Sequence, residues 1–178
     1  MLKVSVTKKG DISSTLKGFP SNVRSSARKA LRDTLKHVRA GLVRETTGKY
    51  YITASRVRKA MTVEGTSIKV SGTREGIEKY KVSPTRPGKR QREVMGAVKQ
   101  GGLKPLGHNV FLMKSGTKYI PMARLTRKRF PIKHVIAPAI PQIASNPETL
   151  EVMQERAEEY FSKRMNYWVM QSIGAVKT

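Results

Sequence analysis

The sequence predicts an α+β fold, with an antiparallel sheet, a long N-terminal helix and a long C-terminal helix, plus a basic extended loop or arm. Three observations predict it. Apolar residues recur at helical spacing over residues 20–46 and 146–173. Short segments between them alternate apolar and polar residues, as half-buried strands do. Residues 83–107 show neither pattern and are rich in Gly, Pro, Lys and Arg, which is typical of a loop.

The chain of 178 residues is expected to form a single domain, residues 1–178, because this length suits one core. Residues 109–141 hold the clearest strand pattern, and we expect the rest of the chain to be organised around them. Five consecutive parts are predicted: an N-terminal strand and turn (1–19), a long helix, short helix and strands (20–82), a basic loop or arm (83–107), a core hairpin and strands (108–145) and a C-terminal helix (146–178).

The first part begins with alternation of apolar and polar residues over residues 2–7, which predicts a short edge strand. Asp11 is expected to cap a brief helical turn that reaches Phe19. Pro20 and Ser21 then open the long helix, which the periodicity extends to about Thr46.

The long helix is expected to carry two stripes. Its apolar stripe faces the core, and the adjoining stripe is cationic, formed by Arg24, Arg28, Arg32, Lys36 and Arg39. Asp33 and Glu45 are the only acidic residues within the helix, so ion pairs along it do not neutralise the stripe. A solvated face is the ordinary alternative for such a stripe. At about 1.5 Å per residue the helix is roughly 40 Å long, so we expect it also to meet a neighbouring subunit.

After the long helix, Thr53 is expected to cap a short helix that runs through Met61. Residues 66–71 alternate and predict a strand, and residues 77–82 predict a weaker one. These two could pair as a hairpin across residues 72–76. Residues 83–107 follow as the basic loop or arm.

The core hairpin is predicted from Val110 onwards, with Ser115 and Gly116 in its turn and its second strand reaching Met122. A basic run follows, and then a second apolar strand over residues 130–136. Asn146 and Pro147 open the last helix, which ends near residue 173. The apolar face of that helix suits the core for most of its length, or a subunit contact.

The charge is strongly positive: 36 Lys and Arg stand against 12 acidic residues, a net charge of +24. Residues 1–93 contribute +16, residues 94–147 contribute +9 without a single Asp or Glu, and residues 148–178 contribute −1. Folded chains tolerate such self-repulsion best when a polyanion neutralises it, so a phosphate-bearing partner is expected. The chain has no Cys, which excludes disulfides and thiolate metal sites. No apolar run is long enough to span a membrane, and no membrane partner is expected.

No pattern for catalysis, cofactor or metal binding stands out. His37, His108 and His134 lie far apart, and no nucleophile elbow, phosphate-binding glycine loop or metal-ligand spacing occurs. The carboxylates of the C-terminal helix are expected to form a solvated face. We therefore expect a protein that is not an enzyme and that has no catalytic residues, no metal and no cofactor. Sequence-specific nucleic-acid modules are also absent, which leaves sequence-independent attraction to phosphates.

Three segments stand out in this order: LVRETTGKYYITASRVRKAM, VFLMKSGTKYIPMARLTRKRFPI and FPIKHVIAPAIPQI. Together they resemble the minor tail protein Z family of long-tailed bacteriophages and, more loosely, the phage tail-completion and neck proteins. With the helices between and after them, the resemblance covers about residues 20–170. It implies a virion structural protein without enzymatic activity, assembled in the host cytoplasm and located at the head-proximal end of the tail.

The charge and the resemblance together predict a homo-oligomeric ring, expected to be hexameric, around a channel for double-stranded DNA. Its other expected partners are the head-tail connector and the tail terminator or tube proteins. The alternative is a ribosome-associated or nucleoid-type protein that binds nucleic acid without sequence specificity. The basic residues expected to face DNA or a protein partner are Arg24, Arg28, Arg32, Lys36, Arg39, Arg86, Lys89, Arg90, Arg92, Arg127, Lys128 and Arg129.

Overall fold

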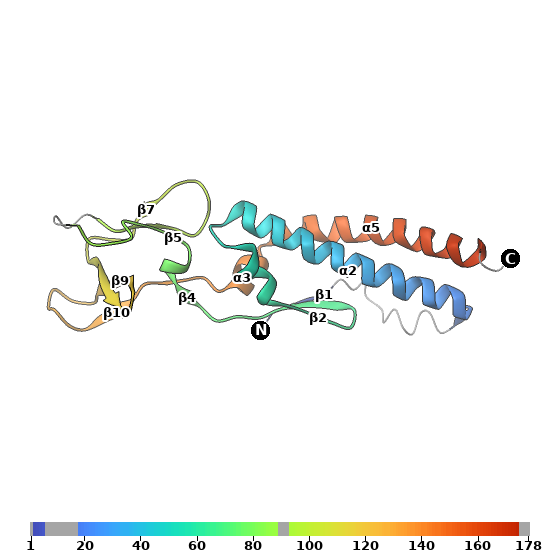
Figure 1. Cartoon of the computed structure of the whole chain (residues 1–178), viewed down its shortest axis with the longest axis horizontal. Coiled ribbons are helices and arrows are strands. Elements are labelled where there is room, and N and C mark those ends of the chain that lie inside the picture. The colour runs from blue at the N-terminus through green and yellow to red at the C-terminus, as the bar shows by residue number, and fades with distance from the viewer. Residues whose placement is uncertain (1, 6–17, 89–92, 175–178) are drawn as a thin grey trace.

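The computed structural model describes residues 2–5, 18–88 and 93–174 and confirms the predicted α+β class. The molecule is elongated, with a pair of long helices at one end and small antiparallel sheets at the other (Figure 1). The elements in order are β1 (Leu2–Ser5), α2 (Ser21–Lys49), α3 (Ala54–Lys59), β2 (Met61–Glu64), β3 (Ser67–Val70), β4 (Glu75–Gly76), η2 (Ile77–Lys79), β5 (Lys81–Ser83), β6 (Met95–Ala97), β7 (Lys104–Pro105), β8 (Val110–Ser115), β9 (Lys118–Arg124), β10 (Ile132–His134), β11 (Ile136–Ala137), α4 (Ile140–Ala144) and α5 (Pro147–Gly174).

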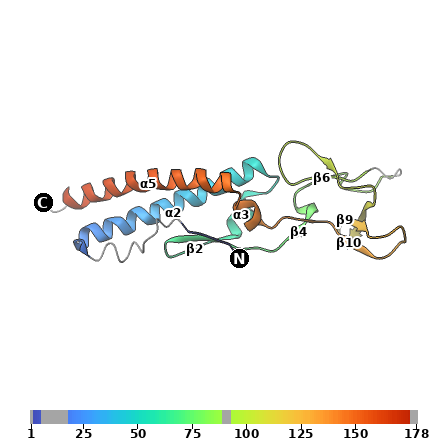
Figure 2. The same ribbon diagram turned by 180° about the vertical axis from the view of Figure 1, so that it is seen from behind.

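Helices α2 and α5 run antiparallel to each other, and we call them the helical pair (Figures 1 and 2). Both long helices are confirmed, and α2 extends three residues beyond the predicted end at Thr46. The Tyr160 ring stacks on the His37 ring with centroids 4.1 Å apart. Gly41 lets the helices approach closely, since a Cβ there would lie 3.0 Å from the sulfur of Met153.

The main core lies between the helical pair, α3, α4 and the sheet β1-β3-β2. Leu42 is 1% exposed at its centre, beside Val57, Ile68 and Val70 from α3 and β3. The predicted N-terminal edge strand is confirmed as β1, while the helical turn expected at residues 11–19 falls mostly outside the described residues.

Strand β2 of this sheet was not predicted. The short helix ends at Lys59 instead of reaching Met61, because Met61 begins β2 and pairs with Val70. The turn between β2 and β3 contains Gly65 at φ 58°. The predicted hairpin across residues 72–76 is therefore wrong: β3 pairs with β1 and β2, and residues 77–79 form a 3-10 turn.

A second, smaller unit spans residues 81–136 and is called the β module here. It contains two three-stranded sheets, β5-β6-β7 and β10-β9-β8. The hairpin β8–β9 is confirmed with Gly116 in its turn at φ 58°. Between the sheets lies a small cluster of Val94, Val110 and Ala123 with partly buried apolar neighbours.

Three expectations about this region are corrected. Residues 83–107 are not simply a loop or arm, since β6 and β7 lie within them and pair with β5. The strand predicted over residues 130–136 is split between β10 and β11, which belong to different sheets. The hairpin does not organise the molecule, because its apolar cluster is smaller than the core built on α2.

Asp33 joins the two helices of the helical pair. Its carboxylate accepts hydrogen bonds from Arg164 Nε at 2.8 Å and Nη2 at 2.5 Å, and from Trp168 Nε1 at 3.0 Å. The hydrogen bonds from Arg164 and then from Trp168 lower the pKa of Asp33 below the usual value of an aspartate. Because the pKa is lowered in the folded state, this stabilisation is present above the unfolded pKa and is lost as pH falls through the folded pKa.

We expect Asp33→Asn to lower the free energy of unfolding by about 1–2 kcal/mol at pH 7, since charged hydrogen bonds are replaced by weaker ones. The difference from wild type should shrink as the pH falls below about 4, because the wild-type carboxylate then becomes protonated. Urea denaturation at several pH values measures it. Glu93→Gln, at an exposed carboxylate without an ion pair to another described residue, is the control. An Asp33→Asn difference that does not change with pH would contradict this role for the carboxylate.

Candidate polyanion-binding surface

The predicted basic residues fall into two groups that the structure does not bring together. Arg24, Arg28, Arg32 and Lys36 are exposed on α2, in the half of the helix that leads away from the β module (Figure 1). Arg86, Arg127, Lys128 and Arg129 are exposed in the β module, at the opposite end of the molecule. Lys89, Arg90 and Arg92 lie outside the described residues.

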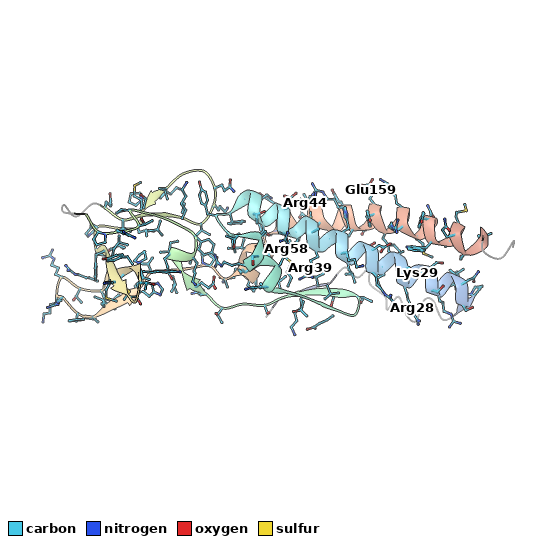
Figure 3. All side chains as sticks on the ribbon, in the orientation of Figure 1. Arg28, Lys29, Arg39, Arg44, Arg58 and Glu159 are labelled. Carbon is cyan, nitrogen blue, oxygen red and sulfur yellow. The ribbon has the colours of Figure 1, made fainter. Side chains whose placement is uncertain are left out.

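Arg39 does not belong to the exposed stripe, and its predicted role is corrected. The side chain is half-buried, and its Nη2 donates hydrogen bonds to the backbone oxygens of Arg58 at 3.1 Å and Met61 at 3.4 Å. It points from α2 towards α3 (Figure 3). Arg39 therefore fastens the short helix and the start of β2 to the long helix.

The β module carries the densest positive charge. Residues 81–136 include 14 Lys or Arg and one acidic residue, Glu93, a net charge of +13. Every described cation in the module is exposed, and none forms an ion pair with another described residue. These are Lys81, Arg86, Lys99, Lys104, Lys114, Lys118, Arg124, Arg127, Lys128, Arg129 and Lys133.

Cations elsewhere are more often neutralised. On the helical pair, Arg164 binds Asp33 at 2.5 Å, Arg156 binds Glu45 at 3.0 Å and Lys163 binds Glu159 at 2.5 Å. Around the core, Arg56 pairs with Glu75. The β module therefore has the higher density of uncompensated positive charge.

The loop between β9 and β10, residues 125–131, is exposed along its whole length, and we call it the tip loop. The Leu125 N–H donates to the Pro131 oxygen at 3.1 Å, which closes the base of the loop. The Lys128 N–H donates to Thr126 Oγ1 at 3.2 Å, which orders its middle. This arrangement presents Arg127, Lys128 and Arg129 together, with exposed Phe130 beside them.

Several cations were missed as site residues by sequence reasoning: Lys81, Lys99, Lys104, Lys114, Lys118, Arg124 and Lys133. The sequence signal for them was the absence of acidic residues from 94 to 147. That signal indicated a basic region but did not show which of its cations belong to the surface. Two of these cations lie over aromatic rings, which holds them in place. Lys81 Nζ is 4.7 Å from the Tyr51 ring centroid, and Arg124 Cζ is 5.1 Å from that of Phe111.

The described residues include no group of three or more His, Asp or Glu placed to hold a metal ion. His134 Nε2 lies 2.8 Å from a carboxylate oxygen of Glu78, in a pair that ties β10 to η2. A cleft of about 570 Å³ opens beside Tyr50 and Ile136, with Arg74 and Lys99 among its lining residues. Within the described part of the chain, no helix is long and apolar enough to cross a bilayer.

No protein-family model matches this chain, and neither the curated proteins nor the solved structures contain a significant match to it.

Proposed function

We propose that this protein is a structural virion component of a tailed bacteriophage, a tail-completion or neck subunit that forms a homo-oligomeric ring around the DNA passage. The observation that carries the proposal is the +13 charge of the β module, which is exposed and not neutralised within the described residues. Duplex DNA presents one negative charge per about 1.7 Å, and cations that contact it release condensed counterions. A sequence-independent cationic surface suits a passage through which any DNA sequence must move.

The fold supports a repeating subunit. The β module lies apart from the main core at one end of the elongated molecule (Figures 1 and 2). Several copies could therefore place their modules around one central DNA duplex. The resemblance to the minor tail protein Z family supports the location in the neck or tail, next to the head-tail connector and the tail terminator or tube proteins. The proposed role requires charge and assembly, and no catalysis.

The functional test is charge reversal in the tip loop. A phage carrying Arg127→Glu, Lys128→Glu and Arg129→Glu is expected to show at least about a tenfold loss of infectious particles, because three like charges would face the DNA phosphates. Tails and DNA-filled heads are counted separately by electron microscopy. Unjoined tails, or heads that have lost DNA, support the proposal, and an unchanged yield of infectious particles contradicts it.

A ribosome-associated or nucleoid-type binder is distinguished by sedimentation of the purified protein. The ring predicts a large species that persists in the absence of nucleic acid and in high salt. A monomer that binds RNA or DNA with a steep salt dependence favours the other class.

A further inference from the structure

The helical pair carries opposite charges at its two ends. The contacts of Tyr160 with His37 and of Arg164 with Asp33 fix which parts of α5 lie beside which parts of α2. Residues 151–158 therefore lie beside the second half of α2, near the core. Residues 24–32 lie beside the last turns of α5, at the end that projects from the core, which we call the free end (Figure 1).

The acidic face of α5 consists of Glu151, Glu155 and Glu158. At 100° per residue these three positions fall within about 60° of one another, and they span roughly 10 Å along the helix. All three are exposed, and none forms an ion pair with another described residue. Glu159 beside them is bound to Lys163.

The free end carries the complementary features. Arg24, Arg28 and Arg32 are exposed, span roughly 12 Å along α2 and have no ion pair to another described residue. Large apolar side chains are exposed on the last turns of α5 at the same end. They are Tyr167 at 47%, Met170 at 72% and Ile173 at 49%.

We infer that the free end of one copy docks onto the acidic face of the next copy, head to tail, and that this contact builds the proposed ring. The cationic stripe of Arg24, Arg28 and Arg32 would lie against Glu151, Glu155 and Glu158 of the next copy. That this contact closes into a ring rests on the proposed function. The contact assigns these α2 cations to a protein partner and leaves those of the β module for DNA.

A second copy fits this surface better than DNA does. The acidic face would repel phosphates, whereas it would attract the cationic stripe of a second copy. The two charged stripes have similar lengths and opposite signs, which sets the register of such a contact.

The contact must be heterologous. Arg28 lies at one edge of the helical pair and Glu159, next to the acidic face, at the other (Figure 3). In two copies related by a two-fold axis, the cationic stripe of each copy would have to contact the acidic face of the other. This is impossible in one interface, because the stripe and the face lie on opposite sides of the helical pair. A heterologous contact leaves one stripe free on each end copy until the ring closes.

Two charge-reversed variants test the inference. One carries Arg24→Glu, Arg28→Glu and Arg32→Glu, and the other carries Glu151→Lys, Glu155→Lys and Glu158→Lys. Sedimentation velocity at about 150 mM salt is expected to show self-association at least about 30-fold weaker in each variant alone, because like charges then meet. An equimolar mixture should recover wild-type mass, since each variant's free end then meets an acceptor face of opposite sign. Circular dichroism melting shows whether both variants are folded.

The inference is overturned if either variant alone has the wild-type mass or if the wild type is a monomer. It is also overturned if the folded variants do not recover the wild-type mass when they are mixed. The tip-loop reversal at residues 127–129 separates it from the proposed function. That variant should keep its assembled mass and lose DNA affinity. If the stripe variants assemble as expected but the tip-loop variant still binds DNA as the wild type does, only the proposed function is contradicted. If the tip-loop variant loses DNA affinity as expected but the stripe variants assemble as the wild type does, only the docking contact is contradicted.

Discussion

Replacing Arg127, Lys128 and Arg129 with alanine should weaken binding of duplex DNA about 100-fold at roughly 0.1 M salt. Each phosphate contact releases close to one counterion, so three lost contacts remove about two to three units from the slope of log K against log salt. The tip loop offers these three cations together, exposed and without ion pairs to other described residues. Fluorescence anisotropy with a labelled duplex, repeated at several salt concentrations, measures both quantities.

A matched control removes the same formal charge elsewhere. Arg44 on α2 and Arg58 on α3 lie outside the β module (Figure 3). Lys59 follows Arg58 in α3, and all three side chains are exposed. Their replacement with alanine should change the DNA affinity less than about threefold and leave the salt slope nearly unchanged. Equal losses in the two triple variants would mean that the net charge, and no particular surface, governs binding.

The second large effect is expected in the core. Leu42→Ala should lower the free energy of unfolding by about 3–4 kcal/mol, because the side chain is 1% exposed and its removal leaves a cavity. For a chain of this size the midpoint of thermal unfolding should fall by about 6–15 °C. Differential scanning calorimetry gives the midpoint, and urea denaturation gives the free energy.

Leu125→Ala is the control for this change, since it deletes the same atoms from a side chain that is 52% exposed. It should alter stability by no more than about 0.5 kcal/mol. A Leu42→Ala variant as stable as Leu125→Ala would contradict the placement of the main core on α2. Below its melting temperature Leu42→Ala should bind DNA as the wild type does, because it leaves the β module intact.

The long helices and the main hairpin could be predicted from the sequence because their signals are local. Pro20 and Pro147 mark where the two helices begin, and Gly116 takes the positive φ that the hairpin turn requires. Periodicity over 25 or more residues then fixes which side of a helix is buried.

Pairing between short strands could not be predicted in the same way. Strands β4, β7 and β11 have two residues each, too few for alternation to appear. Residues 95–97 pair with both β5 and β7, in a stretch whose glycines and prolines are typical of a loop. Such strands form because strands that are distant in sequence supply their hydrogen bonds, and local composition does not indicate which strands will pair.

The same limit applies to the site. The acid-free region was visible in the sequence, and it proved to be most of the β module. Arg39 was grouped with exposed cations because its position on α2 matches theirs, yet α3 and β2 pack against that side and take up its guanidinium. Helical position alone could not distinguish a cation that binds a backbone oxygen from one that faces solvent.

The proposal depends most on one property, which is that the purified protein assembles so that many β modules face a common opening. Electron microscopy of the wild-type protein at about 150 mM salt, without nucleic acid, tests it directly. We expect closed rings, with the helical pairs in lateral contact and the β modules around the central opening. Particles of single-subunit size at micromolar concentration, or rings with the β modules on the outer rim, would contradict the proposal.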